Sequence, residues 1–258
     1  MRPPFDCADP VTRERGLSAA HNAVKRGEVV VLPTDTVYGI GADAFSPPAV
    51  RRLLEAKGRG RDMPPPVLVP EVRTIDGLAS SVPFAVRELV DAFWPGALTI
   101  VCRAQPSLTW DLGETNGTVA LRMPLHPVAL ELLQRTGPLA VSSANLSGRP
   151  AATLVTEAVE QLGESVRVYL DGGASPKGAP STIVDASNGP LRVLRVGALS
   201  EAELRAAVPK GWLETEPAET EPVETEHTEA ERAEPERADA ERAEQVTGGS
   251  RQPGAASG

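Results

Sequence analysis

The sequence predicts an α/β fold, in which a twisted, open, mixed sheet is flanked by helices, followed by a disordered C-terminal tail. Short apolar stretches rich in β-branched residues alternate along the chain with stretches whose apolar residues recur at helical spacing. The composition changes after residue 208, where Glu, Ala and Thr replace the apolar stretches. We therefore expect one folded domain at residues 1–208 and an acidic, low-complexity tail at residues 209–258.

The individual elements follow from local patterns. The apolar stretch 28–33 is continuous and β-branched, which predicts a strand buried on both faces. Further strands are expected at 66–69, 98–103, 118–122, 139–142, 166–170, 182–185 and 191–196. Helices are expected at 14–26, from 47 onward, and at 83–93, 127–134, 156–162 and 201–208. Ser46 before Pro47 and a capping box at 200–203 mark two of the helix starts.

The formal charge of -9 belongs almost wholly to the tail. Residues 209–258 contain 13 acidic and five basic residues, a net of -8, which leaves -1 for the rest of the chain. With Trp212 as its one aromatic residue, this segment cannot bury enough apolar surface to offset the entropy lost on ordering. We interpret it as a flexible, solubilising extension, with a partner-binding segment as the alternative.

The sequence also bears on the cellular compartment. No stretch approaches the ~20 apolar residues that span a bilayer, and the first residues lack the apolar centre of a signal peptide. Cys7 and Cys102 form neither a C-x-x-C site nor a disulfide framework. We expect a cytoplasmic protein that does not associate with membranes.

Several familiar catalytic motifs do not occur. The sequence contains no G-x-x-x-x-G-K-[ST], G-x-S-x-G or H-E-x-x-H, which argues against P-loop NTPases, α/β-hydrolases and zinc proteases. The scattered histidines, His21, His126 and His227, suggest neither a metal site nor a catalytic triad. Residues 39–44 match G-x-G-x-x-A, but they lie well past the end of a strand, so a dinucleotide-binding fold is disfavoured.

Three segments are richer in polar groups than a core requires. Residues 33–41, PTDTVYGIG, end a buried strand with two hydroxyls and a carboxylate, where open sheets bind ligands. Residues 56–62, AKGRGRD, place three cations in five positions, an arrangement suited to phosphates. Residues 140–150, AVSSANLSGRP, end a strand in small hydrogen-bonding side chains. The alternative for each is structural: a capped turn, or cations that complement a helix dipole.

Together and in this order, these segments resemble the TsaC/YrdC family, the threonylcarbamoyl-AMP synthases, in its single-domain form. The resemblance extends over about residues 15–200, through PTDTVYGIGADA, AKGRGRD, FWPGALTIV, TVALRMPLHP, SSANLSGRPAAT and STIVD. It implies a YrdC-like sheet with a large basic cavity. It also implies a catalytic K-x-R and S-x-N tetrad, which falls on Lys57, Arg59, Ser143 and Asn145.

The activity that this resemblance implies joins L-threonine, bicarbonate and ATP into threonylcarbamoyl-adenylate and pyrophosphate, a nucleotidyltransferase reaction. The product serves N6-threonylcarbamoyladenosine formation at position 37 of tRNA. The implied partners are the three substrates, Mg²⁺ arriving with ATP and not in a protein metal site, and downstream tRNA threonylcarbamoyl-transferase proteins, with tRNA contact as a further expectation. By motif position, the L-threonine pocket comprises Thr36, Arg122, Ser143 and Ser181. The ATP site comprises Lys57, Arg59, Thr118, Asn145, Thr153 and Arg195.

The chain departs from the family in the basic segment. Gly60, Met63, Pro65 and Leu68 stand where many members have proline, asparagine, leucine and histidine. We therefore expect no Asn or His contact from this loop, and Arg61 as an additional phosphate contact.

Two other functions remain open at this stage. One is a module that binds double-stranded RNA or tRNA without synthase activity, against which the nearly neutral domain argues. The other is a related domain with a different acyl-adenylate reaction, such as the one in hydrogenase-maturation carbamoyltransferases.

Overall fold

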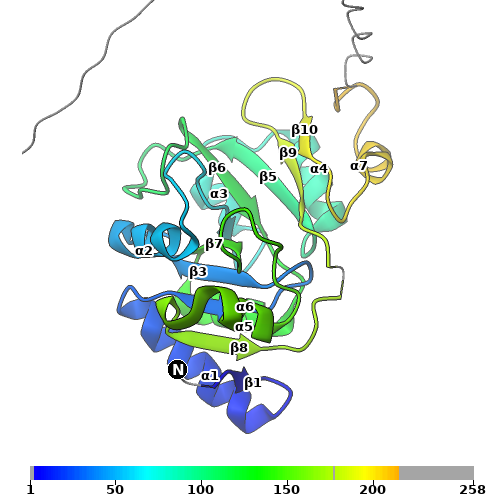
Figure 1. Ribbon diagram of the computed structural model, residues 1–258. Coiled ribbons are helices and arrows are strands. Elements are labelled where there is room, and N and C mark those ends of the chain that lie inside the picture. The colour runs from blue at the N-terminus through cyan, green and yellow to red at the C-terminus, as the bar shows by residue number, and fades with distance from the viewer. Residues whose placement is uncertain (1–2, 177, 215–258) are drawn as a thin grey trace, which may run out of the picture. The chain divides into compact units, whose positions relative to one another are not determined.

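The computed structural model describes residues 3–176 and 178–214, which form one ten-stranded sheet and its flanking helices (Figure 1). The strands are β1 (Phe5–Asp6), β2 (Val30–Leu32), β3 (Gly39–Asp43), β4 (Val67–Leu68), β5 (Leu98–Arg103), β6 (Thr118–Arg122), β7 (Leu139–Ser143), β8 (Val168–Asp171), β9 (Thr182–Asp185) and β10 (Arg192–Arg195). The helices are α1 (Pro10–Lys25), α2 (Pro47–Lys57), α3 (Thr74–Leu78), α4 (Phe84–Phe93), α5 (Pro127–Thr136), α6 (Val155–Leu162), a 3-10 turn (Gly163–Ser165) and α7 (Glu201–Ala207).

The sheet is mixed, as the alternation of elements predicted. Its order is β1-β8-β2-β3-β7-β4-β6-β5-β9-β10, with parallel pairs at β1/β8, β2/β8, β4/β6 and β5/β9 and antiparallel pairs elsewhere. The first half of the chain therefore supplies strands to both halves of the sheet. Figure 1 shows β8 and β1 at one end of the sheet and β9 and β10 at the other.

Two hydrophobic clusters lie on the two faces of the sheet. Val30 and Leu32 of β2 belong to the cluster that includes apolar residues of α1 and α5, whereas Val29 and Val31 belong to the larger cluster with α2 and α4. Successive strand residues point to opposite faces, so this division confirms that β2 is buried on both sides.

Strand β3 was not among the expected strands, because its Gly39-Ile-Gly41 sequence lies past the end of the preceding apolar strand and contains two glycines. It pairs with β2 and β7, and both glycines face Val141 of β7. A Cβ added at Gly39 would lie 2.6 Å from the Val141 side chain, and one at Gly41 would lie 3.2 Å from it. The glycines therefore permit close packing inside the sheet.

The described fold continues past residue 208, where the sequence placed the domain boundary. Leu213 is buried and forms a parallel bridge with Leu191, whose carbonyl accepts a hydrogen bond from the Glu214 amide. Residues 209–214 therefore pack with the domain. The rest of the expected tail, residues 215–258, lies outside the described residues, so its disorder stays a prediction. Within the described part of the chain, no helix combines the length and apolarity that a membrane crossing requires.

Candidate functional site

A cavity of about 510 Å³ lies over one face of β7, β4, β6, β5 and β9. On β6, Thr118, Ala120 and Arg122 line the cavity, while Leu121 belongs to the main core on the opposite face of the sheet. Its polar lining consists of Thr34, Thr36, Thr99, Thr115, Thr118, Ser142, Ser143, Asn145, Ser181 and four arginines, Arg59, Arg122, Arg149 and Arg195. No Asp or Glu of the described residues belongs to the lining, so the cavity favours anionic ligands.

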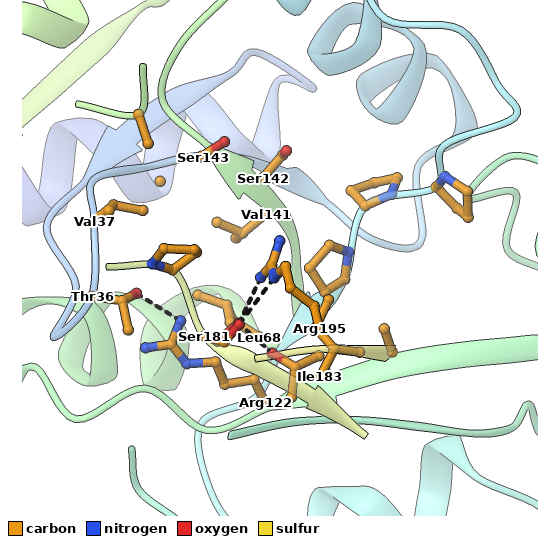
Figure 2. Close-up of a pocket in the computed structure, with 18 of the residues that line it drawn as sticks. Thr36, Val37, Leu68, Arg122, Val141, Ser142, Ser143, Ser181, Ile183 and Arg195 are labelled. Atoms are coloured by element: carbon orange, nitrogen blue, oxygen red, sulfur yellow. Dashed lines mark hydrogen bonds between the residues drawn. The ribbon is translucent and has the colours of Figure 1, made fainter. Parts of the chain in front are cut away.

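The cavity brings together eight of the ten residues that the sequence assigned to the site: Thr36, Arg59, Thr118, Arg122, Ser143, Asn145, Ser181 and Arg195. Figure 2 shows the Ser142 and Ser143 side chains on one side of the cavity and Thr36 with Arg122 on another. These side chains come from segments separated by more than one hundred residues, so only the sheet order places them around one space. Their individual roles stay predictions.

Arg122, at the end of β6, is held in place by three protein acceptors. Its Nη2 donates to Asp35 at 2.6 Å, its Nη1 to the Thr36 hydroxyl at 2.9 Å, and its Nε to the Gly96 carbonyl at 2.8 Å. Burial lowers the pKa of this guanidinium, and the Asp35 carboxylate raises it. These bonds leave one hydrogen on each terminal nitrogen, and the guanidinium lines the cavity.

The threonines before β3 are oriented by a tight turn. Thr34 donates to the Val37 carbonyl at 2.6 Å, and its Oγ1 lies 3.0 Å from that of Thr36. Asp35 points away from the cavity, where it also accepts from the Leu125 amide at 2.9 Å. The hydroxyls of Thr34 and Thr36 therefore line the cavity, while the Asp35 carboxylate binds Arg122 on the side away from the cavity.

Arg59 follows α2, which ends at Gly58 in the left-handed conformation, with φ of 60°. Its Nη1 donates to the Ser142 hydroxyl at 3.0 Å, and its buried Nε has no protein partner. Burial lowers the pKa of Arg59, Asp62 raises it, and Arg195 lowers it. The guanidinium lines the cavity and Ser142 takes only one of its five hydrogens, so further donors remain for an external acceptor.

Arg61 does not have the position that the sequence suggested. Both of its terminal nitrogens bond the Asp111 carboxylate, at 2.7 and 3.1 Å, and it is absent from the cavity lining. This arrangement does not favour the expected additional phosphate contact, which stays a prediction, because Arg61 is already paired with a carboxylate.

Lys57 lies behind the cavity wall and does not line it. The Lys57 ammonium is 2% exposed and donates to the carbonyls of Ser143 and, at 2.7 Å, Asn145. Its place in the expected tetrad is thus indirect: it fixes the backbone that presents Ser143 and Asn145. Burial, followed by the nearby Arg59 charge, lowers the pKa of Lys57 to about 8.

This lowered pKa predicts a pH dependence of stability. Between pH 8 and 10.5 the unfolded chain keeps the Lys57 proton and the folded chain releases it, so the contribution of Lys57 to the free energy of unfolding rises with pH. The expected rise in this contribution is about 3 kcal/mol. The buried thiols of Cys7 and Cys102, whose pKa values are raised by burial, make contributions of the opposite sign in the same range. A neutral amine still has two hydrogens for the two carbonyls. Denaturant unfolding of the wild type and of Lys57→Met across this range measures the effect, because the variant keeps the thiol contributions and loses only that of Lys57. The same pH dependence in the two proteins would contradict the assignment.

Asn145 and Thr153 both form hydrogen bonds that hold the loop between β7 and α6 in place. The Asn145 amide donates to the carbonyls of Leu146 and Arg149, at 2.9 and 2.7 Å. The Thr153 hydroxyl donates to Glu157 at 3.1 Å in the first turn of α6, and Thr153 is absent from the cavity lining. The Thr153 hydroxyl is therefore engaged at the start of α6, and its expected contact with ATP stays a prediction.

A bulge in β10 decides where Arg195 points. The register shifts between Val193 and Arg195, so that Val193 pairs with Val184 and Arg195 with Ile183. Since Val184 faces the core and Ile183 the cavity, Arg195 lies on the opposite face from Val193. Strict alternation along the expected strand 191–196 predicts Val193 and Arg195 on one face, and the register shift shows that this prediction is wrong. Arg195 donates to the Ser181 carbonyl at 2.8 Å (Figure 2).

The lining residues that the sequence assignment did not include comprise Leu68, Thr99, Ser142 and Arg149, among others. Thr99 is buried, and its hydroxyl lies 2.8 Å from that of Ser181. The alternation in 98–103 could have identified it, because it interrupts the apolar residues at 98 and 100. Arg149 is exposed on a loop whose position no local pattern determines.

Comparison with known proteins agrees with this geometry. The model of the Sua5_yciO_yrdC family, described as "Telomere recombination", matches residues 22–197. A Mycobacterium tuberculosis protein named "Putative threonylcarbamoyl-AMP synthase" is 59% identical over 200 residues, which cover 78% of this chain and 92% of the relative. The Bacillus subtilis "Threonylcarbamoyl-AMP synthase" is 35% identical over 199 residues, 76% of this chain and 58% of the relative.

Among solved structures, Pyrococcus abyssi Sua5 complexed with L-threonine superposes with a TM-score of 0.73 at 33% identity. The match covers 77% of this chain and 58% of the archaeal one, so this chain spans little more than half the length of that relative. The family model covers more than half of the sequence and includes every residue of the cavity lining. The chain therefore belongs to the Sua5/YciO/YrdC family.

Proposed function

We propose that this protein is a threonylcarbamoyl-AMP synthase that forms threonylcarbamoyl-adenylate and pyrophosphate from L-threonine, bicarbonate and ATP. Relatives from Mycobacterium and Bacillus carry this name, and the archaeal Sua5 structure holds L-threonine. The observation that carries the proposal is a cavity with four arginines and no lining carboxylate, since both threonine and ATP present anionic groups. This support favours the synthase over the RNA-binding alternative.

Arg122 is the natural partner of the threonine carboxylate. Its remaining donors face the cavity beside the Thr36 hydroxyl, and Asp35 maintains its charge and orientation. A forked pair with a carboxylate in this buried position would orient the amino group toward the rest of the cavity.

The proposed reaction is a nucleotidyl transfer. Carboxylation of the threonine nitrogen, with loss of water from bicarbonate, gives a carbamate whose oxygen attacks the α-phosphorus of ATP. A new P–O bond forms as the bond to the β-phosphate oxygen breaks, and pyrophosphate leaves. Such a step requires positioning and charge neutralisation, which Arg59, Arg195 and the exposed Arg149 would supply.

We propose that Mg²⁺ would be held mainly by the ATP phosphates. The cavity lining offers hydroxyl and amide oxygens but no carboxylate, and no group of three His, Cys, Asp or Glu among the described residues is arranged to hold a metal. Such a lining fits a phosphate-bound ion better than a protein-held one. Delivery of the adenylate to tRNA threonylcarbamoyl-transferase proteins, contact with tRNA and a cytoplasmic location stay predictions.

The test is substrate-dependent pyrophosphate release. The purified protein with ATP, Mg²⁺, L-threonine and bicarbonate is expected to release pyrophosphate, and omission of either threonine or bicarbonate should stop the release. Replacing L-threonine with L-valine provides a matched control, because valine lacks the hydroxyl but has a similar shape. Release without threonine would overturn the proposal.

A further inference from the structure

The loop between β5 and β6 contacts the chain on both sides of α2. Before the helix, the Phe45 ring stacks on Trp110, with ring centroids 5.5 Å apart and an interplanar angle of 18°. After the helix, Arg61 forms its two hydrogen bonds to Asp111. We call residues 110–115 of this loop the clasp.

The backbone of the clasp also meets the basic loop directly. The Glu114 amide donates to the Arg61 carbonyl at 2.8 Å. Gly113 has φ of 110°, and a Cβ added to it would lie 2.6 Å from the same carbonyl. Both the backbone conformation and the space therefore require glycine at this position. The contact thus combines a forked ion pair, a backbone hydrogen bond and a close backbone approach.

The clasp connects this contact to the cavity. Leu112 is 2% exposed and lines the cavity together with Thr115. The Thr115 carbonyl accepts from the Thr118 hydroxyl at 2.7 Å. In the segment that contains the other partner of the ion pair, Arg59 lies two residues before Arg61. The ion pair therefore joins the segments that present two of the expected ATP-binding residues, Arg59 and Thr118.

We infer that the clasp positions Arg59 and Thr118 for the nucleotide, with Asp111 and Arg61 as positioning residues that act through each other. This inference rests on the proposed function. Arg61 is about half exposed and its charge is neutralised by Asp111, so its contribution is to hold the loop and not to bind phosphate.

The experiment compares Asp111→Ala, Arg61→Ala and the double variant. Each single change is expected to raise the KM for ATP roughly two- to fivefold, because an exposed ion pair with two hydrogen bonds contributes a free energy of that size. The double variant is expected to have the same KM as the single variants, since either change already breaks the pair. The KM for threonine should not change, and Asp111→Glu should restore part of the affinity. Arg87→Ala is the matched control, because it breaks the similarly exposed pair of Arg87 with Asp76 at 2.8 Å.

Three results would overturn the inference. If Arg61→Ala raises the KM for ATP and Asp111→Ala does not, Arg61 is a direct phosphate ligand. If the KM of the double variant rises by the product of the two single effects, the two residues act independently. If the KM for ATP is unchanged in all variants, the clasp only contributes to packing. Calorimetric titration of ATP against each variant separates this inference from the proposed function. A wild type that binds ATP without turnover contradicts the synthase, while equal ATP affinities in wild type and variants contradict the clasp.

Discussion

Replacing Arg122 with alanine is expected to abolish threonine-dependent pyrophosphate release and to lower the free energy of unfolding by about 3–5 kcal/mol. Arg122 and Asp35 form an ion pair whose side chains are 7% and 6% exposed, so the variant leaves a buried carboxylate without its cation. The threonine carboxylate loses its partner at the same time. Denaturant unfolding measures the first effect, and pyrophosphate release with a threonine titration measures the second.

A charge-free double variant separates these two effects. Asp35→Asn with Arg122→Met removes both charges and roughly keeps the side-chain volumes, so stability should recover toward that of the wild type. Activity should not recover, and threonine should no longer raise the melting temperature, as a ligand of the native state otherwise does. Threonine protection that persists in this double variant would contradict the role of Arg122 in binding the carboxylate.

Replacing Arg59 with alanine is expected to lower kcat/KM for ATP by roughly 30- to 1,000-fold, which corresponds to about 2–4 kcal/mol. Among the described residues, the Arg59 guanidinium has a single hydrogen bond, to Ser142, and its buried Nε has no partner. Because it is not part of a buried ion pair, its removal should affect stability far less than removal of Arg122. Initial rates of pyrophosphate release across an ATP titration measure the effect.

Two further variants define what Arg59 contributes. Arg59→Lys retains a charge but not the planar fork, so its activity should lie between those of the wild type and the alanine variant. Arg15→Ala removes an exposed arginine of α1 and should leave the kinetics unchanged. Equal activity of Arg59→Ala and Arg15→Ala would remove Arg59 from the phosphate site.

Much of the local structure was predictable from the sequence, because it depends on local patterns. The strands at 98–103, 118–122 and 182–185 have the expected bounds, and the capping box of Ser200 with Glu203 forms as expected. Strand β3 was not predictable in this way, since its glycines are explained by the Val141 side chain of a strand one hundred residues later.

The candidate site shows the same division. Its residues were identifiable by type and motif, and eight of them line one cavity. The register shift that turns Arg195 toward the cavity could not be read from an alternating pattern, because a bulge changes the phase of the strand. The indirect position of Lys57 and the pairing of Arg61 with Asp111 depend on partners 50 or more residues away.

The sequence by itself determined the fold class, most elements and the family, and it predicted the side chains for the chemistry, because these depend on short-range periodicity and motif spacing. Tertiary structure alone decided which of these side chains face the cavity, which stabilise its wall, and which are paired elsewhere. The physical reason is that hydrogen bonding, charge and burial at the site are set by contacts between segments distant in sequence. The same cationic loop thus contains a buried lysine that supports the wall, an arginine open to a ligand, and an arginine neutralised by a carboxylate.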